Sequence, residues 1–408
     1  MSGQQYQTLC VVGGGIVGLA SAMQASVRGV FRNIIVLEKE PEVGQHQTGH
    51  NSGVLHCGLY YQPGSEKARL AVDGIKRMIA FCQQHDIPHE ICGKVVVAVS
   101  EDEVARLKEL ELRGRANGLS GLHWMSKEEL AGREPHVVAK AALLVPQEGI
   151  VDFAGVARKM RDLLQQAGHE VRTGVAFRKL HVSGTQQTVE TSGEPIPVDF
   201  LLNCGGLHAD RICRACGLRP PCRIIPFRGE YFRLNPAGEK LVNHLVYPTP
   251  NPALPFLGVH FTRMLHGGLE AGPNAVLAMR REGYAKTAFS LRDASSALLW
   301  PGWWRFLAKY PAATLREFEN SLFRSAFLRN LQRLVPGVRN SHLLDEGLAG
   351  VRAQAMASDG TLLMDFLLLR APGQLHVLNA PSPGATASLA IGNHIVNQIL
   401  DPHSTPME

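Results

Sequence analysis

The sequence TLCVVGGGIVGLASAMQASVRGVFRNIIVLEKE, residues 8–40, predicts a strand, a tight turn, a helix and a second strand. The apolar run 8–12 ends at three glycines, an alanine-rich stretch continues to about Arg28, and residues 34–37 are apolar again. Parallel strands joined by a helix form a sheet whose faces are covered by helices. We therefore expect an α/β protein with a Rossmann-type domain built on a parallel sheet.

The glycines of this turn match the pattern G-x-G-x-x-G at Gly13, Gly15 and Gly18. In that pattern the first glycine permits the turn, the second lets a pyrophosphate approach the backbone, and the third lets helix and strand pack closely. Glu38 follows the second strand, where a carboxylate accepts hydrogen bonds from ribose hydroxyls and disfavours the 2′-phosphate of NADP. The segment predicts a dinucleotide site, and a plain glycine-rich turn is the alternative.

The next segment, GQHQTGHNSGVLHCGLYYQPG at 44–64, holds five glycines, three histidines and no charged side chain. A long loop of this composition is usually functional. Beyond it we expect helices at 65–85, 101–117 and 154–167, strands at 94–99, 171–177 and 200–203, β structure from 224 to 272 and helices from 287 to 335.

Composition limits the class of protein. The 408 residues suggest about two or three domains, and a charged fraction of only 19% excludes disorder. A net charge of +6 suits an anionic ligand or lipid surface, whereas basic residues that alternate with acidic ones disfavour nucleic acid. Apolar runs stay shorter than the ~18 residues of a membrane span, and the cysteines do not suggest a disulfide scaffold. We expect a cytoplasmic protein.

Several segments together resemble a known family. GGGIVG, LEKE, HQTGHNSGVLHCGLYY, LLNCGGLHAD, IIPFRGEY, FLGVHFT, GPNAVLAMRREGY, AGVRAQ and NAPSPGATASLAIG are similar to the FAD-dependent oxidoreductases related to D-amino-acid oxidase. Within that superfamily the set most resembles the L-2-hydroxyglutarate dehydrogenases and oxidases. The resemblance implies FAD as cofactor and oxidation of L-2-hydroxyglutarate to 2-oxoglutarate.

The succession of α/β, β and helical segments along the chain suggests two domains, each built from more than one segment. A Rossmann-type FAD-binding domain would take residues 1–90, 145–223 and 338–408, and a mixed-sheet α+β substrate domain would take residues 91–144 and 224–337.

The same resemblance implies which residues surround FAD. The adenine end would lie at the glycine turn, Glu38 and the backbone of Val175, and PSPGATAS at 381–388 would lead into a helix that faces the flavin O2/N1 region. A simple helix entry is the alternative for PSPGATAS. The full expected set is Gly13, Gly15, Ile16, Val17, Gly18, Glu38, Lys39, Thr48, His50, Asn51, Ser52, Val175, Cys204, Gly205, Gly206, Pro383, Gly384, Ala385 and Thr386.

Oxidation of a 2-hydroxy acid needs a base for the hydroxyl proton, a hydride acceptor and a cation for the carboxylate. We take His56 as the base, because NSGVLHCGLYY resembles the loop of glycerol-3-phosphate-oxidising relatives and an ordinary histidine is largely neutral at pH 7. His50 is a second candidate that would pack under the flavin. His260 is a third, which would polarise the substrate oxygen. A histidine that only bonds the backbone is the alternative reading of such a loop.

Arg352, in AGVRAQ, is the expected clamp for the substrate carboxylate, because its planar fork binds a carboxylate through two parallel bonds. An ion pair with Asp359 or Asp365 is the alternative. The distal carboxylate of a five-carbon diacid needs a second partner. We rank the candidates Arg281, Lys67, Arg228 and Tyr61, in that order.

Two further motifs carry weaker signals. Cys213-x-x-Cys216 lacks a second pair at zinc spacing, so we expect buried thiols and no metal. Trp300, Trp303 and Trp304 cluster in LLWPGWWRFLAKYP at 298–311, among basic residues. This pattern predicts either a peripheral membrane contact through 298–310, at the inner face of the cell membrane, or an ordinary packing helix.

The electron acceptor would be a quinone or oxygen. Two other functions stay open at this point, namely an amino-acid or amine oxidase of the same fold and a non-catalytic flavoprotein that acts as a binding factor.

Overall fold

A six-stranded sheet forms the base of the molecule in the computed structural model, which describes residues 6–251, 258–344 and 349–401. Its strands are parallel except for the pair β22–β23. In the order of the sheet they are β22 (Leu367–Ala371), β23 (Gln374–Asn379), β13 (Phe200–Asn203), β1 (Tyr6–Val12), β2 (Phe31–Leu37) and β9 (Glu170–Arg172).

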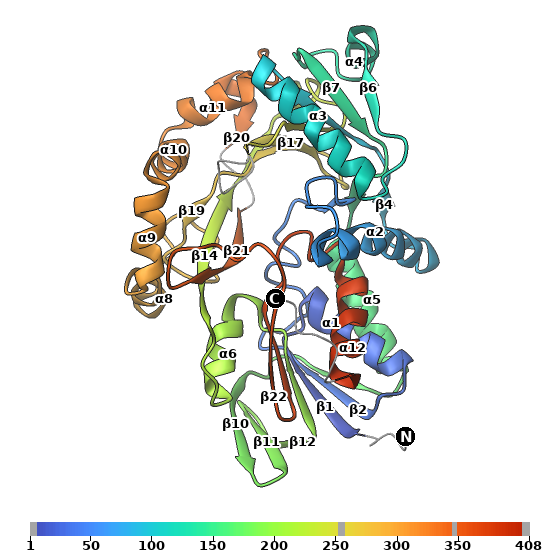
Figure 1. Cartoon of the computed structure of the whole chain (residues 1–408), viewed down its shortest axis with the longest axis vertical. Helices are drawn as coiled ribbons and strands as arrows, with labels where there is room; N and C mark the ends of the chain where they lie inside the picture. Colours follow the sequence, from blue (N-terminus) through green and yellow to red (C-terminus); the bar gives the residue numbers. More distant parts are fainter. Residues whose placement is uncertain (1–5, 252–257, 345–348, 402–408) are drawn as a thin grey trace.

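Three helices cover one face of this sheet, namely α1 (Ile16–Val27), α5 (Phe153–Gln166) and α12 (Ser388–Leu400), and α1 packs against both others (Figure 1). The contact between α1 and α12 is close, because a Cβ on Gly392 would lie 2.7 Å from the carbonyl carbon of Ala20. Buried apolar residues of the sheet and these helices form the largest core cluster. Helix α2 (Glu66–Gln84) packs against α12, and Ser65 caps it.

A second, eight-stranded sheet forms the upper part of the molecule (Figure 1). It is mixed, since β5 and β16 pair in parallel and the other neighbours are antiparallel. Helix α3 (Glu101–Ala116) packs against it. In the order of the sheet its strands are β20 (Leu343–Leu344), β15 (Phe232–Leu234), β18 (Leu269–Gly272), β17 (His260–Arg263), β16 (Leu245–Pro248), β5 (Lys94–Ala98), β7 (Ala141–Val145) and β6 (His123–Met125).

A long antiparallel pair lies between the two sheets (Figure 1). Strand β14 (Cys222–Glu230) pairs along its whole length with β21 (Ala349–Ala357), which places Arg352 opposite Phe227, and β19 (Val276–Leu277) extends the pair. A smaller sheet joins β3 (Val54–Leu55), β8 (Gly149–Val151) and β4 (His89–Glu90). Because β3 lies within the loop 44–64 and pairs with β8, this loop lies next to the residues around Gly149.

Four helices follow one another along one edge of the molecule, from α8 at the lower end to α11 near the top (Figure 1). They are α8 (Leu291–Leu298), α9 (Pro301–Lys309), α10 (Pro311–Leu322) and α11 (Arg324–Gln332). The remaining elements are the helices α4 (Lys127–Arg133), α6 (Ala209–Ala215) and α7 (Pro236–Glu239), and a sheet of β10 (Phe177–Ser183), β11 (Gln186–Thr191) and β12 (Ile196–Val198). In the part of the chain that is described, no helix has the length and apolar character to cross a membrane.

The predicted fold class is confirmed by the parallel sheet and the mixed sheet. The predicted strand 171–177 is wrong, because β9 ends at Arg172 and a turn that contains Gly174 precedes β10. The two domains and their boundaries stay a prediction, and β20, inside 338–408, joins the eight-stranded sheet. Cys213 and Cys216 are buried free thiols, and burial raises the pKa of Cys216 to about 12.

Candidate active site

A cavity of about 1020 Å³ collects residues from both large sheets and from the β14–β21 pair. The glycine turn, the loop 44–64, the segment 204–208, strand β21 and the segment 377–386 all contribute to its lining. Every residue of the expected cofactor set lines this cavity except Gly18. Gly18 serves packing instead, since a Cβ there would lie 2.1 Å from the Gly13 carbonyl oxygen.

The glycine turn is shaped for a ligand that approaches its backbone. Gly13 has a φ of +113°, and a Cβ there would lie 2.5 Å from the Cys204 carbonyl oxygen, so only glycine fits. A Cβ on Gly15 would meet only Thr48 Oγ1, at 3.6 Å. The protein itself therefore does not require a glycine at position 15, and the open space above the start of α1 suits a phosphate.

Glu38 lies at the end of β2, buried, where its carboxylate accepts hydrogen bonds from Gly14 N and Glu40 N, both at 2.9 Å. Val175 donates its N–H to the Glu38 carbonyl at 2.9 Å, so only its carbonyl remains for the predicted bonds to adenine. The chain after β9 pairs with the end of β2 in this way, and the contact of Val175 with adenine stays a prediction.

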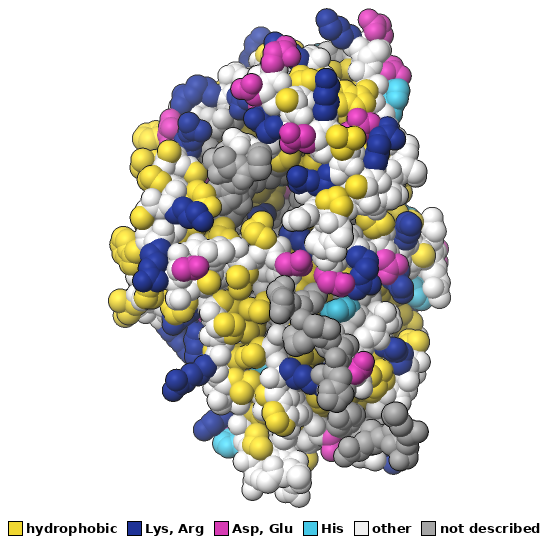
Figure 2. Space-filling view, in the orientation of Figure 1, with side chains coloured by type: hydrophobic (Ala, Val, Ile, Leu, Met, Phe, Trp, Pro, Cys, Tyr) yellow, Lys and Arg dark blue, Asp and Glu magenta, His cyan; other side chains and the backbone are white. Residues whose placement is uncertain are grey.

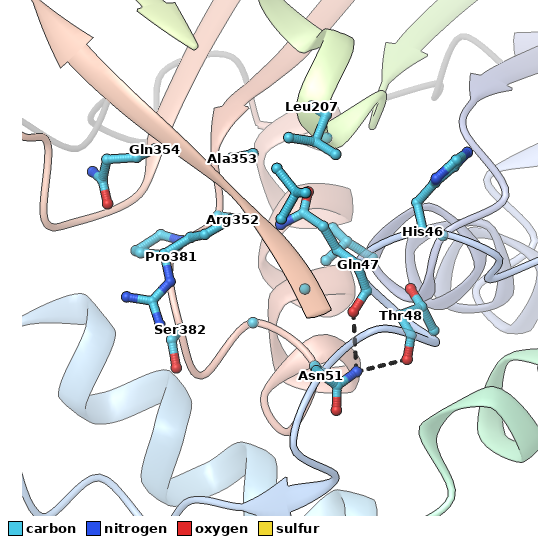
Figure 3. A pocket seen from close by; sticks show the side chains of 18 of the residues that line it. His46, Gln47, Thr48, Asn51, Leu207, Arg352, Ala353, Gln354, Pro381 and Ser382 are labelled. Atoms are coloured by element: carbon cyan, nitrogen blue, oxygen red, sulfur yellow. Dashed lines mark hydrogen bonds between the residues drawn. The ribbon is translucent and has the colours of Figure 1, made fainter. Parts of the chain in front are cut away.

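Two polar side chains hold the loop 44–64 in shape. Thr48 Oγ1 accepts a hydrogen bond from Ile16 N at 3.0 Å, which ties the loop to the first turn of α1. Asn51 Nδ2 donates to the carbonyls of Gln47 and Thr48, the two dashed lines of Figure 3, and its Oδ1 accepts from Gly53 N. Both residues line the cavity, and both also build the loop.

Lys39 belongs to a cluster of charges at the edge of the cavity. Its Nζ lies 2.9 Å from Glu282 Oε2 and 2.9 Å from His46 Nε2, and it also pairs with Glu40. Glu40, His46 and Glu282 place their ligand atoms within 4.8 Å of one another, as a metal would require. The Lys39 ammonium already pairs with both carboxylates, so we assign no metal here.

Residues 377–386, which precede the start of α12 at Ser388, line the cavity. Thr386 Oγ1 accepts a hydrogen bond from His56 N at 3.3 Å and donates to the Val54 carbonyl at 3.3 Å. The loop 44–64 and the segment PSPGATAS are therefore bonded directly to each other. Figure 3 shows Arg352 and Ser382 on one side of this pocket and Gln47, Thr48 and Asn51 on the other.

His56 lines the cavity at the end of β3, with its side chain 19% exposed. Its Nδ1 lies 3.3 Å from Glu148 Oε2. Glu148 is fully buried and lies 2.6 Å from the Nζ of Lys94, which is also fully buried. Sequence reasoning missed both residues. The signal in the sequence was a charged residue next to an apolar strand. Lys94 begins the strand KVVVA, and Glu148 directly precedes the strand GIV.

His260 is buried in the lining, and its ring stacks on Tyr247 with the centroids 3.8 Å apart. Burial lowers the pKa of His260 to about 3, and the charges of His56, Lys94 and Arg352 add to this shift. The ring is therefore neutral at pH 7. Its Nδ1 lies 3.0 Å from the Gly258 carbonyl and must donate to it, which leaves Nε2 as an acceptor. The expectation that His260 polarises the substrate oxygen is corrected, because an acceptor nitrogen cannot donate a hydrogen bond to that oxygen.

Two cations of the expected set reach the cavity. Arg352 projects from β21 with an exposed side chain and, within the described residues, has no hydrogen-bond or ion-pair partner, Asp359 and Asp365 included. Lys67 is 9% exposed, donates to the Met364 carbonyl at 3.0 Å, and lies 4.6 Å from the centre of the Tyr61 ring. Tyr61 also lines the cavity.

Burial lowers the pKa of Lys67 to about 8, while Asp365 opposes the shift and Arg352 adds to it. The two cations therefore repel each other inside one cavity, and an anion bound between them would relieve that repulsion.

Arg281 and Arg228 were wrongly expected to bind the distal carboxylate. Arg281 is buried away from the cavity, with Nη2 3.0 Å from Asp210 Oδ2. Arg228 places Nη2 2.7 Å from Glu230 Oε1 and Nη1 2.8 Å from the Ala285 carbonyl. Both guanidinium groups neutralise buried acids, because a buried charge requires a partner.

The tryptophan segment is divided between the interior and the surface. Trp303 is buried against Phe227 and Phe306, whereas Trp304 is 59% exposed. None of the residues of α10, all of which are described, is buried. Figure 2 shows hydrophobic side chains along the edge formed by α8–α10. The exposed large apolar residues of this edge are Phe289, Leu291, Leu299, Trp304, Leu315, Phe318, Leu322 and Phe323.

Comparison with known proteins agrees with this geometry. A sequence model of the family described as "FAD dependent oxidoreductase" matches residues 8–398. The chain is 44% identical over 386 residues to an L-2-hydroxyglutarate dehydrogenase of Indibacter alkaliphilus, covering 94% of this chain and 96% of that protein. It is 40% identical over 408 residues to the human mitochondrial L-2-hydroxyglutarate dehydrogenase, covering 96% and 88%.

Among solved structures, the dithionite-reduced L-alpha-glycerophosphate oxidase of Mycoplasma pneumoniae with FAD bound is similar in fold. Its TM-score is 0.75 at 23% identity, with 97% of this chain and 94% of that chain covered. Glycine oxidase from Geobacillus kaustophilus has a TM-score of 0.72 at 17% identity, covering 99% and 96%.

Proposed function

The chain belongs to the family of FAD-dependent oxidoreductases, and we propose that it oxidises L-2-hydroxyglutarate to 2-oxoglutarate. The similarity to relatives named L-2-hydroxyglutarate dehydrogenase supports this substrate. One observation carries the proposal. A single cavity is lined by His56, whose ring contacts the buried carboxylate of Glu148, and by the two cations Arg352 and Lys67.

FAD fits the lining described above. The open backbone at Gly15 and the start of α1 suit the pyrophosphate, and Glu38 suits the ribose. The start of α12 suits the negative charge that reduction places on the flavin. When bound, the flavin supplies the acceptor for the hydride that leaves C2 of the substrate.

The two cations match the two carboxylates of the substrate. Arg352 has a planar fork and, among the described residues, has no protein partner, so we assign it the carboxylate next to the hydroxyl. Within the described part of the chain Lys67 donates one hydrogen bond, to the Met364 carbonyl, and an ammonium has three donors. We assign Lys67, with Tyr61 beside it, to the distal carboxylate.

His56 acts as the base in this proposal. The 2-hydroxyl proton passes to His56 Nε2. The electrons of the broken O–H bond form the C=O bond at C2, while the C2–H bond breaks and its hydrogen leaves as a hydride. His260 lies in the same lining as a neutral ring, and because the hydroxyl has one proton, which His56 accepts, we assign His260 no part in the proton transfer.

The exposed apolar edge of α8–α10 supports a peripheral contact with a lipid surface through residues 298–310 and their neighbours. Leu299 is 80% exposed and Trp304 59%, and the basic Arg305 and Lys309 lie on the same helix. Such a contact would allow reoxidation by a membrane quinone, with oxygen as the alternative acceptor.

Anaerobic mixing of the FAD-loaded protein with single substrates tests the function. Rapid bleaching of the flavin absorbance by L-2-hydroxyglutarate, and not by D-2-hydroxyglutarate, L-lactate or glycerol 3-phosphate, is the expected result. Faster bleaching by glycine, proline or another amino acid would favour the amine-oxidase alternative. Unchanged absorbance with every compound would favour a non-catalytic flavoprotein.

A further inference from the structure

The carboxylate of Glu148 contacts His56 in the protein interior, and nothing in the reaction outlined above requires it to touch the substrate. We infer that Glu148 is a positioning residue, which holds the His56 ring in the tautomer that leaves Nε2 free to accept the substrate proton. This inference rests on the proposed role of His56 as the base.

The position of Glu148 is fixed from several directions. Its side chain is fully buried, and its backbone carbonyl accepts a hydrogen bond from Gly93 N at 2.8 Å. Oε1 accepts from Cys57 N at 3.1 Å and from Cys57 Sγ at 3.3 Å, while Oε2 faces His56 Nδ1 and Lys94 Nζ. A carboxylate with these four contacts has one defined orientation.

The contacts also define the tautomer of His56. An ionised carboxylate only accepts hydrogen bonds, so Nδ1 must carry the proton of the 3.3 Å contact. The neutral ring then has its lone pair on Nε2, which is the form that a base requires. The carboxylate is ionised, because burial would raise the pKa of Glu148 but the Lys94 ammonium and the His56 ring outweigh burial and hold that pKa well below its usual range.

Lys94 explains why a negative charge is needed here. Its Nζ is fully buried, 4.4 Å from the centre of the Tyr60 ring and 5.0 Å from that of Tyr247. A buried ammonium beside His56 would oppose protonation of the imidazole during turnover. Glu148 neutralises that ammonium.

The other groups that face His56 cannot replace this charge. They are the Tyr247 ring at 6.4 Å between centroids, the neutral His260, and the hydroxyl of Thr386 at the His56 backbone. Burial raises the pKa of the Cys57 thiol and of the Tyr60 and Tyr247 phenols, so all three are neutral at pH 7. Among the described contacts of His56, Glu148 is therefore the group that carries negative charge.

The test compares Glu148→Gln with the unaltered protein, both loaded with FAD. We expect kcat to fall by about tenfold to a hundredfold, because a general base contributes a factor of about 10²–10⁴ and the variant weakens it without removing it. The acidic limb of the pH profile of kcat/KM should move to lower pH, while KM for L-2-hydroxyglutarate stays within about twofold. Glu148→Asp, which keeps the charge, should recover part of kcat.

Glu134→Gln is the matched control. Glu134 is also a fully buried carboxylate that pairs with a histidine, His244 Nδ1 at 2.8 Å, but it lies outside the cavity lining. Its replacement should lower stability without moving the pH profile. Should Glu148→Gln not fold, the double variant Lys94→Met with Glu148→Gln removes both charges together and is measured in its place. Its expected loss of kcat is smaller, because the ammonium that opposes protonation of His56 is gone and only the loss of the tautomer preference remains, whereas an unchanged kcat and an unchanged tautomer would overturn the inference.

A spectroscopic readout needs no turnover. Two-bond ¹H–¹⁵N correlation spectra of protein labelled with ¹⁵N-histidine, with the signal assigned through His56→Ala, should show His56 with its proton on Nδ1. Glu148→Gln should shift it toward the Nε2 tautomer. An unchanged tautomer together with an unchanged pH profile would overturn the inference. Normal turnover of His56→Ala would contradict the proposed role of His56 as the base. Normal turnover of Glu148→Gln, together with loss of turnover in His56→Ala, would contradict only the inference about Glu148.

Discussion

The ring of His50 stacks on the ring of Tyr284, with the centroids 3.7 Å apart and the planes 13° from parallel. Tyr284 Oη also lies 2.9 Å from His46 Nδ1. One tyrosine therefore holds two histidines of the loop 44–64 against the segment that carries Glu282. This loop supplies Thr48, Asn51 and His56 to the cavity, so its position should govern how the cofactor is held.

We expect Tyr284→Ala to weaken FAD binding by about twofold to tenfold, which corresponds to an aromatic pair worth about 0.5–1.5 kcal/mol. Tyr284→Phe keeps the stack and loses only the hydroxyl, so it should retain most of the affinity. Flavin fluorescence on titration of the apoprotein measures both values. Equal affinity in the alanine variant would show that the loop holds its shape without the stack.

Lys67 should give the substrate affinity an alkaline limit. Burial lowers its pKa to about 8, so the ammonium is fully present below that pH and is lost as the pH rises through it. KM for L-2-hydroxyglutarate should therefore be flat at pH 6–7 and rise by up to about tenfold for each pH unit well above 8.

Lys67→Met should remove this rise and raise KM at pH 7 by about tenfold or more, because a hydrogen bond to a charged group contributes about 1.5–3 kcal/mol. The same variant should barely change KM for L-2-hydroxyvalerate, which has the same chain length and no distal carboxylate. Equal effects on the two substrates would remove Lys67 from the distal subsite.

Arg352→Met should raise KM for both of these substrates, since each has the carboxylate next to the hydroxyl. A loss of about tenfold to a hundredfold in affinity is expected for a charge-assisted fork. Arg352→Lys keeps the charge without the fork and should recover only part of it. Steady-state kinetics at pH 7 measures KM for the unaltered protein and for both variants. An unchanged KM in the methionine variant would contradict the assignment.

Arg281→Met should act on stability and leave substrate binding unchanged. The substitution strands the buried carboxylate of Asp210, which costs about 3–5 kcal/mol when a buried pair loses one partner. Urea unfolding measures the loss. Its neighbour Arg280 is exposed, so Arg280→Met should change the unfolding free energy by less than about 0.5 kcal/mol. A raised KM without loss of stability in Arg281→Met would restore this residue to the site.

The double substitution Leu299→Ser with Trp304→Ser tests the lipid contact. Both side chains are exposed, so the melting temperature should change little, while co-flotation with anionic liposomes should fall several-fold. Leu112→Ser on α3, which removes a leucine that is 67% exposed elsewhere, should leave flotation unchanged. Equal flotation of the double variant and the unaltered protein would contradict a contact through this edge.

Local sequence was sufficient for the elements that depend on local physics. The helix from Ser65 to His85 was predictable because its apolar face repeats every turn and Ser65 accepts from Ala68 N. Strand β13 has the predicted bounds, because its short apolar run is buried along its whole length. The glycine turn was predictable because the backbone there accepts only glycine at position 13. The predicted strand 171–177 failed where a turn interrupts an extended run.

The amino-acid sequence by itself determined the dinucleotide turn, the acid that follows β2 and the loop that holds His56. Tertiary structure alone decided which charges face the cavity. The sequence offers Arg281 and Lys67 alike as cations for the distal carboxylate. In the fold Asp210 neutralises Arg281, whereas Lys67 keeps donors for a ligand in the cavity that Arg352 also lines. Glu148 reaches His56 only because β8 pairs with β3, and Lys94 joins them because β5 pairs with β7. The partner of a buried charge depends on strand pairing across the fold, and no local pattern encodes that pairing.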